Sequence, residues 1–126
     1  MLRKKLFAEF LGTGTLVATV VGSGIMATDI SADVGIQLLI NTIATVFVLY
    51  ILITLLAPIS GAHFNPLVSV ISYLRKELSL VNTFWFLAAQ VLGGSLGAIL
   101  ANLMFEHPAL DPSQKVRDGA HLFLGE

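Results

Sequence analysis

Residues 58–69 read PISGAHFNPLVS and interrupt a chain that is otherwise strongly apolar. Two prolines and a glycine within this stretch disfavour a continuous helix, because proline lacks an N–H donor and glycine adopts backbone conformations that other residues avoid. Apolar runs flank the stretch on both sides. The sequence therefore predicts irregular backbone at membrane depth, and the flanking segments are expected to hold this break in place.

The composition is that of an integral membrane protein. Of the 126 residues, 56% are hydrophobic and 12% are charged, with a mean hydropathy of +0.86, whereas soluble domains are about 25% charged. This length favours one membrane domain, residues 1–126. The absence of cysteine excludes disulfides, thiolate nucleophiles and cysteine metal sites. A net charge of −1 gives no indication of a nucleic-acid partner, and none is expected.

Three long apolar segments predict three membrane-spanning helices. Residues 6–28, 34–57 and 83–105 each contain about 23 residues, which rise roughly 34 Å as a helix and match a hydrocarbon core of about 30 Å. Basic residues precede the first segment, as in a secretory signal peptide, but its length and the acid Glu9 near its start favour a true span. Pro58 is expected to end the second helix, because proline disfavours helix continuation.

A fourth helical segment, residues 66–74, is too short to cross. Asn65 is expected to cap it and Pro66 to occupy its first position, where the missing N–H costs nothing. The segment rises only about 13 Å, roughly half a bilayer. Because Lys and Arg favour the cytoplasmic side, the basic residues at 3–5 and 75–76 both belong there. The chain between them must enter the membrane and return, with a cytoplasmic N-terminus in the plasma (inner) membrane.

Irregular backbone in a membrane occurs only inside protein or along a water-filled cavity, because unsatisfied polar groups cost several kcal/mol each in hydrocarbon. The loop at residues 60–64 is therefore expected to line a cavity with its carbonyls. The Asn65 amide adds two donors, and the half-helix N-terminus adds about half a positive charge. Such a path exchanges hydrogen bonds with a neutral solute and opposes cations.

These motifs resemble those of a known family. Residues 60–66, SGAHFNP, are similar to the first signature of the major intrinsic protein family, the aquaporins and glycerol facilitators, whose motif is usually S-G-x-H-x-N-P-A-V-T. AEFLGT at residues 8–13 resembles the start of that family's first helix, and AAQ at 88–90 followed by Gly93 resembles its third. The resemblance covers nearly the whole chain. It implies an all-α membrane protein with three transmembrane helices and one re-entrant half-helix, the N-terminal half of an inverted-repeat fold.

The resemblance also implies roles for individual residues. Asn65 donates to the permeating solute, and Glu9 is a buried support for the re-entrant loop. Gly93 and Gly97 lie one turn apart and independently predict a surface for close helix packing. The pore positions are then Gly61, Ala62, His63, Asn65, Pro66, Leu67 and Thr45, and the supporting positions are Glu9, Gln90, Gly93 and Gly97. No metal or cofactor is expected.

Three departures from the family pattern bear on function. Leu67 and Ser69 stand where the motif usually has Ala and Thr. Thr45 stands where many water-selective members carry a bulky aromatic, which indicates a wider or more polar filter for glycerol-like solutes or metalloid hydroxides. The second Asn-Pro half-helix and the filter arginine are absent from these 126 residues.

The missing half has two explanations. LFLGE at residues 122–126 echoes LFAE at 6–9 and reads as the start of a missing second repeat, as in a truncated or split gene product. An antiparallel homodimer would also supply a second half, but the positive-inside bias opposes insertion in both orientations. Assembly as a tetramer is implied by the family resemblance.

Functions other than a channel are also compatible with parts of this sequence. A small non-conducting membrane subunit fits the same sequence, as does a fragment of a secondary transporter, although few ionisable groups are present to bind a coupling ion. Ser60, His63 and Glu9 resemble a catalytic triad in composition, but no nucleophile elbow accompanies them. The protein is not expected to be an enzyme.

Overall fold

The computed structural model describes residues 1–112, which are all-helical with no strand in that range. The helices are α1 (Leu2–Ile30), α2 (Val34–Ser60), α3 (Pro66–Leu74) and α4 (Leu80–Met104). By length and composition, α1, α2 and α4 can each cross a membrane, whereas α3 has 9 residues. The predicted fold of three spans and one half-helix is therefore confirmed. The predicted repeat start at 122–126 lies outside the described residues.

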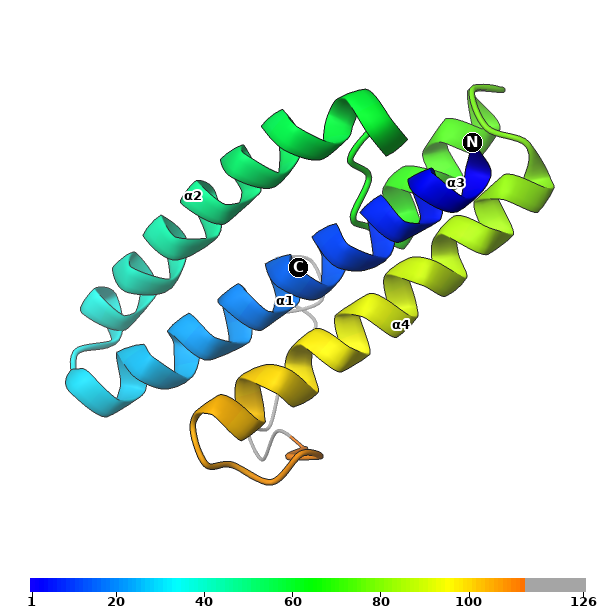
Figure 1. Cartoon of the computed structure of the whole chain (residues 1–126). Coiled ribbons are helices and arrows are strands. Elements are labelled where there is room, and N and C mark those ends of the chain that lie inside the picture. Colours follow the sequence, from blue (N-terminus) through cyan, green and yellow to red (C-terminus); the bar gives the residue numbers. More distant parts are fainter. Residues whose placement is uncertain (113–126) are drawn as a thin grey trace, which may run out of the picture.

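Helix α1 lies at the centre of the arrangement (Figure 1). It packs against α2 on one side and α4 on the other, while α3 packs against α4. Helices α1 and α4 begin at the same end of the molecule and run in the same direction (Figure 1). Helix α2, which comes between them in the sequence, runs in the opposite direction (Figure 1). This order of directions brings the start of α1, the end of α2 and the start of α4 together at one end.

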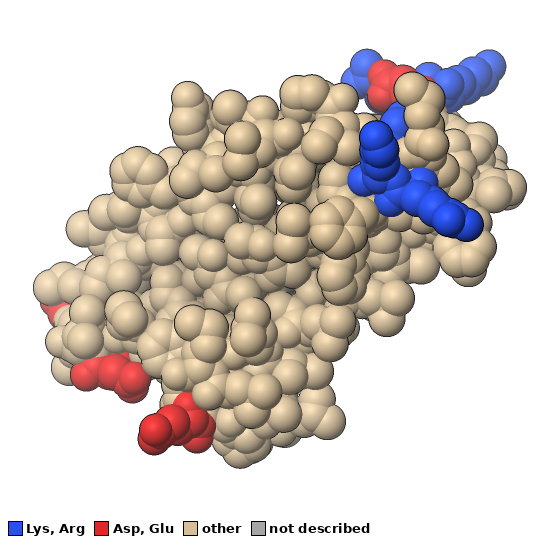
Figure 2. Space-filling view, in the orientation of Figure 1, with Lys and Arg blue, Asp and Glu red and all other residues tan. Residues whose placement is uncertain are grey.

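The charged side chains are segregated between the two ends. On the face drawn in Figure 2, Lys and Arg gather at the end where the N-terminus lies, and acidic groups gather at the opposite end. The exception is Glu77, which lies in the basic region and pairs with Arg75 at 2.9 Å. The link from α3 to α4 lies at the basic end in Figure 1. The segment between α2 and α4 therefore enters the bundle and returns to the end from which it came.

The prediction that Pro58 ends the second helix is wrong. Helix α2 continues through Pro58 to Ser60 and ends at Gly61, which has φ +96° and donates its N–H to the Ala57 carbonyl at 3.0 Å. A proline removes one helix hydrogen bond and can bend a helix, but it does not always end the helix. The left-handed glycine stops the helix, because it reverses the direction of the backbone.

The remaining boundaries follow local capping. Helix α3 begins and ends as predicted, with the Asn65 side chain accepting from the Leu67 N–H at 2.8 Å. Helix α4 begins three residues before the predicted start, because Ser79 caps it and accepts from the Asn82 N–H at 3.3 Å. Helix α1 extends the predicted 6–28 span at both ends.

Two glycines allow α1 and α4 to approach closely. A Cβ atom on Gly93 would overlap the Phe10 carbonyl oxygen, and one on Gly97 would overlap the Gly14 carbonyl oxygen. The backbones at these points are therefore nearer than any larger residue permits, as in helix pairs packed through small residues. This contact places the neighbouring Gln90 of α4 against Glu9 of α1.

Candidate functional site: a re-entrant loop held by a buried carboxylate

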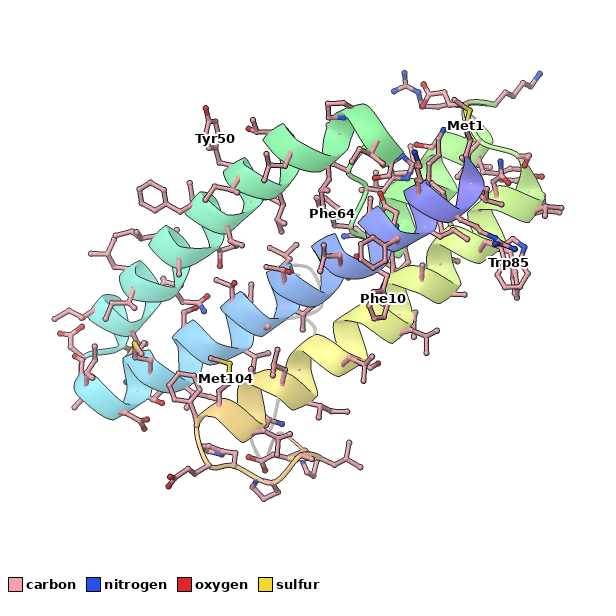
Figure 3. The ribbon with its side chains drawn as sticks, viewed as in Figure 1. Met1, Phe10, Tyr50, Phe64, Trp85 and Met104 are labelled. Atoms are coloured by element: carbon pink, nitrogen blue, oxygen red, sulfur yellow. The ribbon has the colours of Figure 1, made fainter. Side chains whose placement is uncertain are left out.

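The loop between α2 and α3 folds back sharply over residues 61–65. Gly61, Ala62 and Phe64 all have left-handed backbone conformations, with φ values of 96°, 52° and 48°. For residues other than glycine this conformation costs of order 1–3 kcal/mol and persists only where the surroundings enforce it. The Phe64 side chain is 5% exposed and packs against Gly12, where a Cβ would overlap its ring; Figure 3 shows Phe64 beside α1.

Glu9 supplies the main restraint on this loop. Its side chain is fully buried and accepts four hydrogen bonds. Oε1 accepts from Ser60 Oγ at 2.5 Å and from the His63 N–H at 3.0 Å. Oε2 accepts from the Phe64 N–H and from Gln90 Nε2, both at 2.8 Å. One carboxylate thus joins α1, the end of α2, the loop and α4 in a pattern that suits an ionised, acceptor-only group.

Ser69 of α3 extends this network. Its hydroxyl accepts from Gln90 Nε2 at 2.9 Å and lies 2.9 Å from His63 Nδ1. Because the Ser69 oxygen accepts from Gln90, its own hydrogen is available for His63 Nδ1, so one hydroxyl links the two residues. The His63 ring also meets Phe86 edge-on, with centroids 5.4 Å apart. Through Ser69, the half-helix is tied to the same buried cluster that holds the loop.

The hydrogen bonds to the loop N–H groups determine where its carbonyls point. The N–H groups of His63 and Phe64 face Glu9, and that of Ala62 faces Ser60 Oγ at 3.1 Å. All described peptide bonds are trans, so each carbonyl points opposite the N–H of its own peptide unit. The carbonyls of Gly61, Ala62 and His63 therefore point away from the buried carboxylate. None of the described residues donates to them.

Asn65 lies at the end of this row of carbonyls. Its side chain is exposed, and its Oδ1 caps α3 by accepting from Leu67 N–H. Capping therefore uses the oxygen and leaves both amide hydrogens without a partner among the described residues. Pro66 occupies the first turn of α3, and Leu67 is 65% exposed beside it. The site thus combines outward-facing acceptors with one outward-facing donor group at a helix N-terminus.

Thr45 lies apart from this cluster, within α2. Its hydroxyl donates to the Asn41 carbonyl of its own helix at 2.8 Å and makes no hydrogen bond with the loop. Asn41 in turn joins α2 to α1, donating to the Val20 carbonyl at 2.8 Å and to Ser23 Oγ at 3.0 Å. The predicted loop residues and the supports Glu9 and Gln90 are brought together near the start of α3. The supports Gly93 and Gly97 lie along the contact between α1 and α4.

Sequence reasoning did not assign Ser60, Phe64 and Ser69 to the support of the loop. The signal available for Ser60 and Ser69 was a small hydroxyl residue on each side of the break in an otherwise apolar sequence. The sequence gives less indication of the role of Phe64, because its ring packs against Gly12, which is distant in the sequence. Two fully buried atoms, Thr13 Oγ1 and Gln90 Oε1, have no partner among the described residues.

Three spans, a half-length helix and a loop with outward carbonyls define an integral membrane protein with one re-entrant segment. Within that class, the chain belongs to the major intrinsic protein family, whose model matches residues 1–123. This is a family of channels, and the match confirms the resemblance read from the loop motif.

Several curated proteins are similar to the chain. An aquaglyceroporin of Rhizobium meliloti (strain 1021), AqpS, is 50% identical over 99% of this chain and 54% of its own length. A probable TIP-type aquaporin of Nicotiana tabacum, RB7-18C, is 29% identical over 97% of this chain and 50% of its own length. Aquaporin A of Dictyostelium discoideum is 33% identical over 75% of this chain and 34% of its own length. The chain thus spans about half the length, or less, of these relatives.

Proposed function

We propose that this chain is one half of a passive channel for water or small neutral solutes and conducts when a second repeat completes the pore. The observation that carries the proposal is the free amide of Asn65, which stands at the N-terminus of α3 beside the outward carbonyls of the loop. Capping by Oδ1 fixes the side chain so that its donors remain available. The oxygen of Asn65 can therefore cap the helix while its amide nitrogen donates to a solute.

The polarity of the site fits a neutral solute better than an ion. Carbonyl acceptors and an amide donor together replace the hydrogen bonds that water or an alcohol loses on leaving bulk solvent. The N-terminus of α3 contributes about half a positive charge near the same point, which opposes cations. The buried negative charge of Glu9 is engaged by four donors and lies on the far side of the loop backbone from the carbonyls.

The proposed solutes are glycerol-like molecules or metalloid hydroxides in addition to water. Thr45 supplies a small side chain at the position where many water-selective family members carry a bulky aromatic. A relative 50% identical to the chain bears the name aquaglyceroporin, which agrees with a filter wide enough for a polyol. Leu67 adds bulk beside Asn65 and is expected to narrow the path at that point.

Charge and length support a proposal for the partner and the orientation. We propose that a second half-repeat packs against this chain, since the relatives are about twice as long. The basic end is proposed to face the cytoplasm and the protein to lie in the plasma (inner) membrane. The segregation of charge between the two ends opposes a dimer in which one copy is inverted. A tetramer is proposed on family grounds alone.

Reconstitution tests the proposal directly. Liposomes containing the 126-residue chain alone should swell in glycerol or urea no faster than empty liposomes. Liposomes containing the chain together with the separately expressed C-terminal half of AqpS should swell faster, as measured by stopped-flow light scattering. Flux through the chain alone would overturn the requirement for a second repeat.

The alternative is a small subunit or truncated product without channel activity. The half-length match to relatives favours it as strongly as it favours a split channel. The two differ in the paired experiment, because a non-conducting product would leave swelling unchanged even when the second half is present and copurifies with it.

A further inference from the structure

Lys76 has an unfavourable backbone conformation just after the end of α3. Its φ is 63°, and its N–H donates to the Tyr73 carbonyl at 2.9 Å. The next N–H, that of Glu77, donates to the Ser72 carbonyl, also at 2.9 Å. Many helices end with this pair of bonds, and the left-handed position is usually glycine because a side chain is unfavourable there. We propose that Lys76 binds anionic phospholipid headgroups and thereby anchors the half-helix at the membrane surface.

The local fold does not require a lysine at this position. The two hydrogen bonds join backbone groups, so glycine at residue 76 would make both without placing a Cβ in the left-handed region. The negative end of the α3 dipole attracts a cation, but this attraction is weak at an exposed position and is screened by salt. A residue that is unfavourable for the backbone around it indicates a role outside that backbone.

The ammonium group of Lys76 is available for a lipid phosphate. Neighbouring Arg75 is engaged by Glu77 at 2.9 Å, whereas Lys76 takes part in no ion pair within residues 1–112. The link between α3 and α4 therefore carries a net positive charge. It lies at the basic end of the molecule (Figures 1 and 2). An anionic membrane surface complements this charge and attracts lysine side chains that lie next to it.

The segments beside Lys76 place it at the level of the headgroups. Helix α4 begins at Leu80, whose side chain is 64% exposed, and continues as a membrane span. Phe84 and Trp85 follow one turn later with ring centroids 5.5 Å apart, and tryptophan is typical of the membrane interface. The 9 residues of α3 rise about 13 Å. Anchoring the end of α3 at the surface therefore holds its beginning roughly half a bilayer deep, which makes Lys76 a positioning residue for the re-entrant segment.

Glu106 offers a matched control at the opposite end of the molecule. It follows α4 with a φ of 61°, and the His107 N–H donates to the Asn102 carbonyl at 2.9 Å, as in the motif after α3. Its charge has the opposite sign, so an anionic membrane surface does not attract it. Replacing Glu106 by glycine therefore relieves the same backbone conformation and leaves the cations of the basic end in place.

Quenching of a single tryptophan by brominated lipid tests the proposal. In a reporter chain with Leu80→Trp and Trp85→Phe, the sole tryptophan lies four residues after Lys76. In vesicles, we expect brominated phosphatidylglycerol to bind near this tryptophan about fivefold more tightly than brominated phosphatidylcholine. Lys76→Gly in the reporter chain should lower this preference to less than about twofold, because the free cation is lost. Lys76→Arg and Glu106→Gly should both retain it.

Thermal unfolding in neutral detergent, followed by circular dichroism, separates anchoring from folding. Both glycine variants should unfold at or above the temperature of the parent, because each removes a side chain from a left-handed position. A lower unfolding temperature for Lys76→Gly would show that the lysine serves the helix itself.

Two lipid results would contradict the proposal. An unchanged preference in Lys76→Gly would mean that the other cations of the basic end attract the lipid. Equal loss of preference in Lys76→Gly and Glu106→Gly would assign the effect to the backbone change. The vesicles contain the 126-residue chain without a second repeat, so neither result depends on whether the chain conducts.

Discussion

Glu9 shows how a single side chain can stabilise broken backbone in a membrane. An isolated carboxylate in a medium of low dielectric constant is unfavourable by tens of kcal/mol in the idealised limit, so it is found buried only when strongly paired. Glu9 has no cationic partner among the described residues and is instead met by two backbone N–H groups, a hydroxyl and an amide. Hydrogen bonds to a charged group contribute about 1.5–3 kcal/mol each, so four of them are enough to fix the loop.

Replacing Glu9 by glutamine should destabilise the protein although the shape of the side chain is kept. The glutamine NH₂ group can only donate, so at least one of the loop N–H groups of His63 and Phe64 would lose its acceptor. We expect the free energy of unfolding to fall by about 2–4 kcal/mol. Equilibrium unfolding in mixed micelles, followed by circular dichroism, measures this change.

The same substitution at Glu106 is the control, because that side chain is exposed and outside the cluster. It should leave the unfolding free energy within about 0.5 kcal/mol of the parent. Equal stability of the Glu9→Gln and Glu106→Gln variants would show that the carboxylate does not hold the loop.

At the scale of elements, the sequence predicts the ends of a helix best where neighbouring residues determine them. The bounds of α3 follow from Asn65 and Pro66, which are adjacent to the helix they start. The end of α2 was predicted wrongly, because Gly61 sets it and the Ser60 hydroxyl is anchored by Glu9, a residue 51 positions away. The partners of Glu9 could not be derived from spacing alone. The family resemblance supplied its role, and the packing of α1 on α4 supplies the geometry.

The contact between α1 and α4 makes two neighbouring glycines respond oppositely to the same change. Gly97→Ala would drive a Cβ into the Gly14 backbone, and such overpacking costs about 1–3 kcal/mol. At Gly94 the nearest atoms, methyl groups of Thr13 and Val17, are 3.5 Å from an added Cβ. Gly94→Ala should therefore be neutral or stabilising by up to about 1 kcal/mol, since alanine favours helix.

Unfolding of the two alanine variants under identical conditions measures the difference. A loss of stability confined to Gly97→Ala would support close backbone packing at that point. If both variants matched the parent, the two helices would have to lie farther apart than the structure places them.

At the scale of the whole molecule, the segregation of charge defines a topology. The described basic residues lie at one end with the start of α1 and the link between α3 and α4, and acids dominate the other end (Figures 1 and 2). Helix α1 crosses the membrane and α2 crosses back, so the chain returns to the side on which residue 5 lies. Residue 76 lies on that same side only if the segment between α2 and α4 does not cross the membrane. The half-helix is thus required by the arrangement of charge as well as by its own length.

Cysteine labelling can test this topology cleanly, because the chain contains no cysteine. In intact cells, Lys5→Cys and Lys76→Cys should be protected from a membrane-impermeant maleimide, and Asp33→Cys and Glu106→Cys should react. Permeabilised cells give the control, since all four should then react. Reaction of Lys76→Cys together with protection of Lys5→Cys would mean that the re-entrant segment crosses the membrane.

In the proposed channel, Asn65 caps α3 with its side-chain oxygen and contacts the solute with its amide N–H groups. Asn65→Asp separates the two roles, because aspartate also caps helices but has no donor when ionised. The decisive measurement is stopped-flow glycerol flux in liposomes containing the chain and the C-terminal half of AqpS. The Asn65→Asp chain should assemble and stay as stable as the parent while flux falls to the level of empty liposomes. Undiminished flux from the correctly assembled variant would contradict the account.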